Sequence, residues 1–119
     1  MSDFLDKAFS SHAAVKDRLR KSILGQADLD ASVIRRDDVC VVGQWIYGEG
    51  GAKHRSNALF EQFKTVHAEF YQEAYKAMML ASQGDNARAL AAIEQGGFQK
   101  KSAEIAQCIG KMKKDPAFK

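Results

Sequence analysis

The chain has 119 residues, of which 45% are hydrophobic and 28% are charged. This length suits one compact domain over residues 1–119, and no apolar run approaches the roughly 18 residues that a membrane span needs. Eighteen Lys and Arg residues against 15 Asp and Glu residues give a net charge of +3. Because this excess is small and spread along the chain, we expect no nucleic-acid partner. The lack of a long apolar run excludes a transmembrane protein.

The N-terminal segment does not have the pattern of a secretion signal. It carries Asp3 and Asp6 and has no basic segment followed by an apolar stretch. We therefore expect a cytoplasmic protein. In that compartment the two cysteines, Cys40 and Cys108, are expected to be free thiols rather than a disulfide.

The first helix is predicted over residues 4–23, because apolar side chains recur there every three or four residues on one face. Ser2 or Asp3 can cap its start, and Gly25 can end it. Residues 26–36 lose the pattern and are predicted to form a connecting loop. Three apolar side chains of this loop are expected to pack against the body: Leu29, Val33 and Ile34.

A short apolar run at residues 39–47 fits a strand or a helix by periodicity alone. The preceding acidic residues, Asp37 and Asp38, and the lack of a second strand for pairing favour a short helix that ends at Gly48. The glycine-rich residues 48–51 then predict a flexible turn within a loop of about ten residues.

A long helix is predicted over residues 60–81, with Ser56 or Asn57 as its cap and Gly84 after its end. Its apolar positions alternate at steps of three and four, which is typical of a helix that faces a core.

The same spacing continues over residues 91–112 up to a lysine-rich end. Gly96 and Gly97 lie inside this last helix, where a kink is expected, and Pro116 lies beyond it in the tail. Three long amphipathic helices and a short one that carries Cys40 predict an all-α fold, an antiparallel four-helix bundle.

Three side chains with zinc-binding chemistry occur where burial is expected. His12 and His67 lie on the apolar faces of two different helices, where an imidazole is costly unless its nitrogens have partners. A single such histidine is more often an ordinary core residue. Two of them, together with Cys40 in the apolar short segment, indicate a zinc site, because thiolate and neutral imidazole are the ligands that zinc prefers.

These residues also form a recognisable motif. A Cys-x-x-Gly-x-Trp sequence at residues 40–45 is preceded by His-Ala-Ala-Val at residues 12–15 and followed, after 21 residues, by His67. The pattern resembles the CZB family, the chemoreceptor zinc-binding domains of bacteria. This resemblance implies a four-helix bundle that binds one zinc ion through a histidine of the first helix, the motif cysteine and two histidines spaced four apart. The matching residues here are His12, Cys40 and His67.

The fourth ligand position departs from the family pattern, because Tyr71 stands where the second histidine of the pair is expected. Tyr71, one turn from His67, can itself ligate; a water or an anion can complete an open three-ligand site; or His54 can reach in from the loop. A further alternative is that the substitution abolishes the site and leaves a structural helical bundle. Of these, an open or Tyr71-assisted zinc site ranks first.

Three further residues are expected to have structural roles. Gly43 is predicted to allow a close helix approach, Trp45 to anchor the short helix with a largely buried ring, and Cys108 to pack as a small apolar residue.

The resemblance implies a zinc-binding sensory or regulatory module of bacterial signalling, of the chemotaxis or cyclic-di-GMP type, that responds to zinc or to oxidation of Cys40. Because the chain leaves no room for an output domain, we expect it to form a homodimer or to bind a signalling partner.

The main alternative is a metal-free helical bundle for protein interaction, and a weaker one is a hydrolase with an open zinc position. The sequence has no phosphate loop, dinucleotide motif or catalytic triad pattern, so we expect no enzyme.

Overall fold

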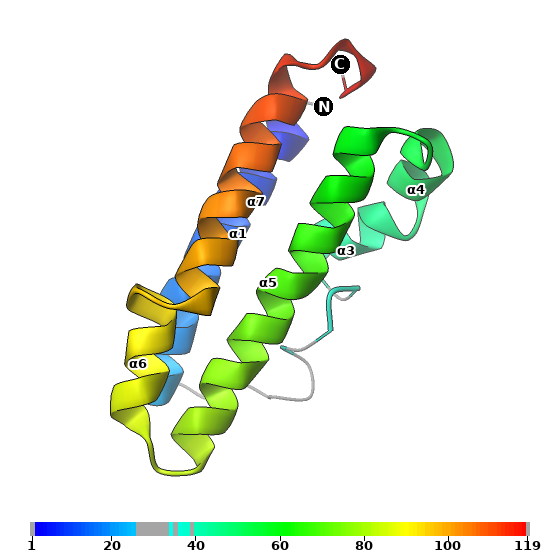
Figure 1. The fold of residues 1–119 in the computed structure, drawn as a ribbon. Coiled ribbons are helices and arrows are strands. Elements are labelled where there is room, and N and C mark those ends of the chain that lie inside the picture. Colours follow the sequence, from blue (N-terminus) through cyan, green and yellow to red (C-terminus); the bar gives the residue numbers. More distant parts are fainter. Residues whose placement is uncertain (1, 26–33, 35, 39, 119) are drawn as a thin grey trace.

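The computed structural model describes residues 2–25, 34, 36–38 and 40–118, and all regular structure in these residues is helical (Figure 1). The all-α class predicted from the sequence is therefore confirmed. None of the described helices is long and apolar enough to span a membrane. In chain order the helices are α1 (Ser2–Ile23), α3 (Val41–Ile46), α4 (Glu49–His54), α5 (Ala58–Ser82), α6 (Asn86–Glu94), α7 (Gly97–Lys114) and the 3-10 helix η1 (Pro116–Phe118).

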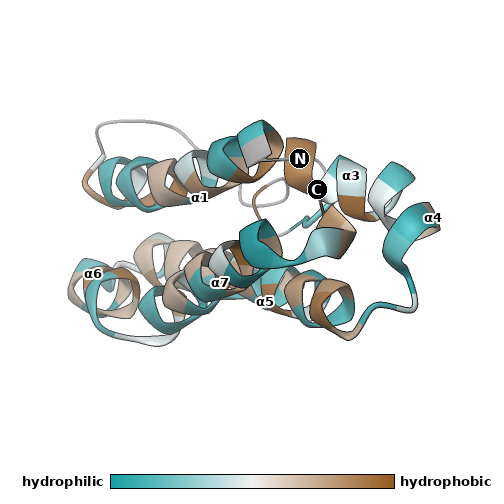
Figure 2. Cartoon of the chain, turned by 90° about the horizontal axis from the view of Figure 1, so that it is seen from above, coloured by the Kyte–Doolittle hydropathy of each residue, from teal (hydrophilic) through white to brown (hydrophobic). Residues whose placement is uncertain are grey.

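The long helices lie side by side (Figure 1). α1 and α5 run in the same direction, and α6 followed by α7 returns along them. α5 packs against α6 and α7, α1 packs against the same two helices, and α3 and α4 lie together near the start of α5. Each long helix carries both apolar and polar residues (Figure 2), as expected for helices with one buried face.

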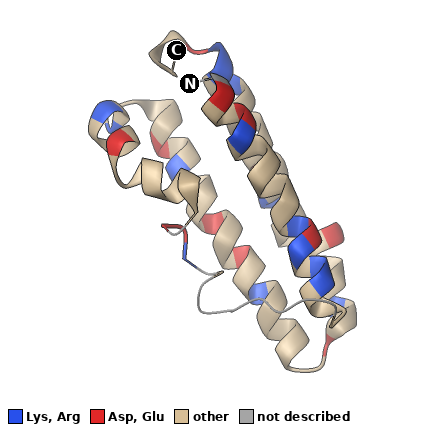
Figure 3. Ribbon diagram, turned by 180° about the vertical axis from the view of Figure 1, so that it is seen from behind, with Lys and Arg blue, Asp and Glu red and all other residues tan. Residues whose placement is uncertain are grey.

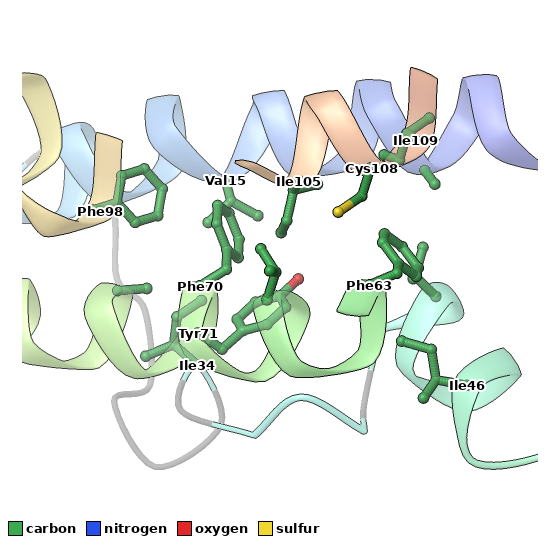
Figure 4. Close-up of a cluster of buried hydrophobic side chains, with 14 of the residues drawn as sticks. Val15, Ile34, Ile46, Phe63, Phe70, Tyr71, Phe98, Ile105, Cys108 and Ile109 are labelled. Atoms are coloured by element: carbon green, nitrogen blue, oxygen red, sulfur yellow. The ribbon is translucent and has the colours of Figure 1, made fainter. Parts of the chain in front are cut away.

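The core between the long helices is rich in aromatic and branched side chains (Figure 4). Phe70 of α5 and Phe98 of α7 are fully buried, with ring centroids 4.8 Å apart. Burying one such side chain stabilises the fold by about 1.5–3 kcal/mol relative to leaving it in water. Ile34 also joins this core, as predicted, whereas Leu29 and Val33 lie outside the described residues.

Charged residues of both signs are distributed along the helices (Figure 3). Some of them link different helices: Arg20 of α1 pairs with Glu94 of α6, and Lys101 of α7 pairs with Glu69 of α5. Because such pairs are solvent-exposed, each contributes about 0–1 kcal/mol, so the apolar core determines the packing.

The predicted helix ends are confirmed where glycine or a capping side chain marks them. Gly25 and Gly84 have φ angles of +75° and +86°, a left-handed conformation that costs glycine little because it has no Cβ. Asn57 caps α5, since its side-chain oxygen accepts a hydrogen bond from the Phe60 N–H at 3.0 Å.

The last predicted helix is broken rather than kinked. α6 ends at Glu94, and α7 begins at Gly97. The carboxylate of Glu73 lies so close to Gly97 that an added Cβ would come within 2.5 Å of its Oε2. A negative charge at this place is favourable because a helix N-terminus carries partial positive charge. Contact with α5 therefore stabilises a new helix start at the glycine pair.

The loop predicted after Gly48 is wrong in its central part, which forms α4. Gly50 packs directly against the Trp45 ring, and an added Cβ there would come within 2.5 Å of it. The Trp45 ring also packs against Phe4 and Phe60 at centroid distances of 5.2 and 5.6 Å. Trp45 is thus the predicted anchor, although its side chain stays partly exposed. Its ring packs over α4, the segment that its glycine content alone predicts to be a turn.

Candidate metal site

His12 of α1, Cys40 at the start of α3 and His67 of α5 come together in the core. The ligand atoms that they offer all lie within 4.8 Å of one another. The Cys40 Sγ and the His67 Nε2 are 3.4 Å apart. Two such atoms on one tetrahedral zinc ion are expected about 3.6 Å apart, given Zn–S and Zn–N bonds of about 2.3 and 2.1 Å. The three side chains predicted from the sequence therefore suit one shared metal ion.

His12 is held in the orientation that a metal ligand requires. Its ring is 2% exposed, and its Nδ1 lies 2.8 Å from the carbonyl oxygen of Ala8, one turn earlier in α1. Because a carbonyl can only accept, Nδ1 carries the proton and Nε2 has a free lone pair. This buried Nε2 has no hydrogen-bond partner among the described residues. A carbonyl partner on one nitrogen with the other left free is the usual state of a metal-ligating histidine.

His67 is fully buried, and its ring meets that of His12 edge-on at a centroid distance of 4.9 Å. Its Nδ1 has no partner among the described residues. Burial, together with the nearby His12, lowers the pKa of His67 to about 3. Burial also lowers the pKa of His12, although the hydrogen bond to Ala8 opposes this shift. Both imidazoles are therefore neutral at pH 7, which is the protonation state that metal binding needs.

Cys40 is the N-cap of α3, and its sulfur accepts a hydrogen bond from the Gly43 N–H at 3.3 Å. Gly43 is required here because an added Cβ would overlap the backbone carbonyl of Asp37. The close approach predicted for Gly43 is thus to the backbone just before Cys40, not to another helix. This contact keeps the cysteine at the positive end of a short helix, where a thiolate is favoured.

Tyr71 lies in the same cluster, one turn beyond His67. Its side chain is buried, and its ring centroid lies 5.1 Å from that of His67 and 5.9 Å from that of His12. Burial raises the pKa of Tyr71 above its usual value, and the nearby Cys40 raises that pKa further. Figure 4 shows the hydroxyl turned into the space between α5 and α7.

The other sequence candidates lie elsewhere. His54 packs its ring against Phe118 at 4.5 Å, and it is not among the three clustered donors of the described chain. Cys108 of α7 is buried in the apolar core, as predicted, and burial raises the pKa of its thiol. The Ala8 carbonyl is a partner of His12 that was not predicted from the sequence, although a spacing of four residues on one helix face indicates such a contact.

Comparisons with known proteins add no relative. No family model matches the chain, and no curated protein or solved structure is significantly similar to it. The function is therefore argued from the site itself.

Proposed function

We propose that this chain is a zinc-binding regulatory module in which His12, Cys40 and His67 hold one zinc ion. The observation that carries this proposal is the group of three zinc-type donors within 4.8 Å, two of them fully buried imidazoles with an unpartnered nitrogen. An unpartnered buried polar atom costs about 1–3 kcal/mol. A metal ion relieves this cost at the Nε2 of His12, and it stabilises the Cys40 thiolate.

The residues around the site have distinct roles in this proposal. The Ala8 carbonyl fixes the tautomer of His12, and the Gly43 N–H orients the Cys40 sulfur. α3 already contacts the long helices through the Trp45 ring, which packs against Phe4 and Phe60. A metal ion bound to Cys40 would add a second tie from the start of α3 to α1 and α5, so that metal occupancy changes how firmly this end of the molecule docks on the long helices.

The ligand set and the motif also support membership of the CZB family. On this proposal the fold is the antiparallel four-helix bundle of that family, with α1, α5 and the α6–α7 pair as its long helices and α3 as the short one. The module is cytoplasmic and has no enzymatic activity. It signals, as a homodimer or through a signalling partner, in response to zinc or to oxidation of Cys40.

A metal-free interaction module is the second candidate, and exposed apolar side chains favour it. Among the described residues, four large apolar side chains are about half or more exposed: Phe9, Leu24, Val41 and Tyr47. Such side chains gain stability when a partner covers them. This candidate differs from the first in needing no metal.

Metal analysis of protein purified without chelator or metal-affinity resin separates the two candidates. We expect about one zinc per chain after zinc addition and dialysis. Cys40→Ser is expected to weaken zinc binding by at least about a hundredfold, or 2.7 kcal/mol, whereas the matched variant Cys108→Ser leaves it unchanged. A zinc content far below one per chain, or equal effects of the two variants, would contradict the zinc site.

A further inference from the structure

We propose that the metal keeps one coordination position for a small exogenous monoanion, and that Tyr71 packs beside the ligands instead of binding the metal. This inference rests on the proposed zinc site and concerns what completes it. It differs from the arrangement with four protein ligands that the family resemblance implies.

The number of donors is the first argument. In the described residues the cluster contains three donors from the His, Cys, Asp and Glu side chains. Closed structural zinc sites have four protein ligands, whereas sites with three keep the fourth position for water or another small ligand. One thiolate and two neutral imidazoles leave a divalent ion with a net charge of +1. In a buried environment of low dielectric constant, this charge favours an anion in the fourth position.

The placement of Tyr71 is the second argument. Its ring is held by packing beside the ligands, with its centroid 5.0 Å from Phe70 and 5.1 Å from His67. Zinc prefers thiolate, imidazole and carboxylate ligands to a neutral phenol. Tyr71 is therefore a packing neighbour of the site and leaves the fourth position to a small ligand.

A small cavity lies beside His12, and this proposal assigns it to the anion as its access route. It has a volume of about 70 Å³ and lies between α1 and α7. This volume admits water or a molecule of a few atoms. Its walls are mostly small or apolar residues: Phe9, His12, Ala13, Ser102, Ile105 and Ala106.

Cobalt(II) substitution and azide titration test the open position, because cobalt absorption reports both thiolate ligation and coordination geometry. We expect a thiolate-to-cobalt band at one cobalt per chain and a saturable change of the ligand-field bands with sodium azide. Absence of the thiolate band would overturn the proposed zinc site itself. A thiolate band whose ligand-field spectrum ignores azide would overturn only the open position.

Tyr71→Phe tests the role of the phenol. We expect cobalt affinity to stay within about threefold and the azide response to persist. The thiolate-to-cobalt band should also remain. A loss of cobalt affinity of tenfold or more would make Tyr71 a ligand and overturn the proposal.

Two further variants test closure and access. Tyr71→His places a second imidazole one turn from His67, so it is expected to tighten cobalt binding at least tenfold and to abolish the azide response.

Ala106→Leu fills the cavity and is expected to weaken or slow azide binding at least tenfold. Its matched control is Ala103→Leu on the exposed side of α7. Equal azide binding by the two leucine variants would overturn the access route.

Discussion

Two neighbouring parts of one core are stabilised in different ways. In the apolar layer, formed by Phe70 and Phe98, fully buried rings meet at 4.8 Å and leave no polar atom to satisfy. In the polar layer, formed by His12, Cys40, His67 and Tyr71, two imidazoles are equally buried but keep unpartnered nitrogens. Phe70 joins the layers, since its ring lies 5.2 Å from that of His12. Burial alone stabilises the first layer, whereas the second needs a ligand.

The largest effect is expected from Phe98→Ala in the apolar layer. Removing a fully buried ring leaves a cavity and is expected to lower the free energy of unfolding by about 3–5 kcal/mol. Zinc affinity at the polar layer should stay within about threefold. Urea unfolding and a zinc-competition assay measure the two quantities. Phe9→Ala, at a half-exposed position of α1, is the stability control and should cost about 0.5 kcal/mol or less.

Gly43→Ala is expected to disturb the polar layer from the backbone side. The added methyl group overlaps the Asp37 carbonyl, so it should destabilise the start of α3 by about 1–3 kcal/mol and weaken zinc binding at least about tenfold. At Gly110, in α7, an added Cβ meets no atom within 4 Å. Gly110→Ala should therefore stabilise the fold by about 0.5–1 kcal/mol and leave zinc affinity unchanged. Similar zinc affinities for both variants would contradict the role given to Gly43.

Acid is expected to destabilise the metal-free protein through the polar layer. The pKa of His67 is about 3 when folded and near its ordinary value of about 6.5 when unfolded, so only the unfolded chain takes up this proton between those values. Stability is therefore complete above about pH 6.5 and falls as pH decreases toward 3. At pH 5 the loss is about 2 kcal/mol from His67 alone.

Urea unfolding in chelator at pH 7.5 and pH 5 measures this loss. The variant His67→Phe fills the same space without a titrating group, so its stability should depend less steeply on pH. Equal pH dependence of the variant and the original chain would contradict a neutral, buried His67.

The smallest effect is expected from His54→Ala, which contrasts a histidine outside the polar layer with those inside it. The His54 ring packs against Phe118, so its removal should cost about 1 kcal/mol of stability. Zinc affinity should stay within about threefold, as measured by competition. A tenfold loss of affinity would place His54 at the metal.

The sequence alone predicts most of the helices and the three clustered donors. Glycines at 25 and 84 and the cap at Asn57 act locally, through positive φ angles and a side-chain hydrogen bond. His12 and His67 were identifiable because a polar ring on an apolar helix face is exceptional and needs a partner. Their approach to Cys40 then follows from helices that pack their apolar faces together.

Other features depend on contacts between segments that are distant in the sequence. The helix start at Gly97 depends on the carboxylate of Glu73, and the close packing of Gly50 in α4 depends on the ring of Trp45. The Cys40 Sγ, 3.4 Å from the His67 Nε2, likewise joins the start of α3 to α5. Local preferences of single residues amount to about 1 kcal/mol or less, so packing between elements can override them. Only the tertiary structure therefore decides where α7 begins, whether α4 forms and how close the Cys40 sulfur comes to His67.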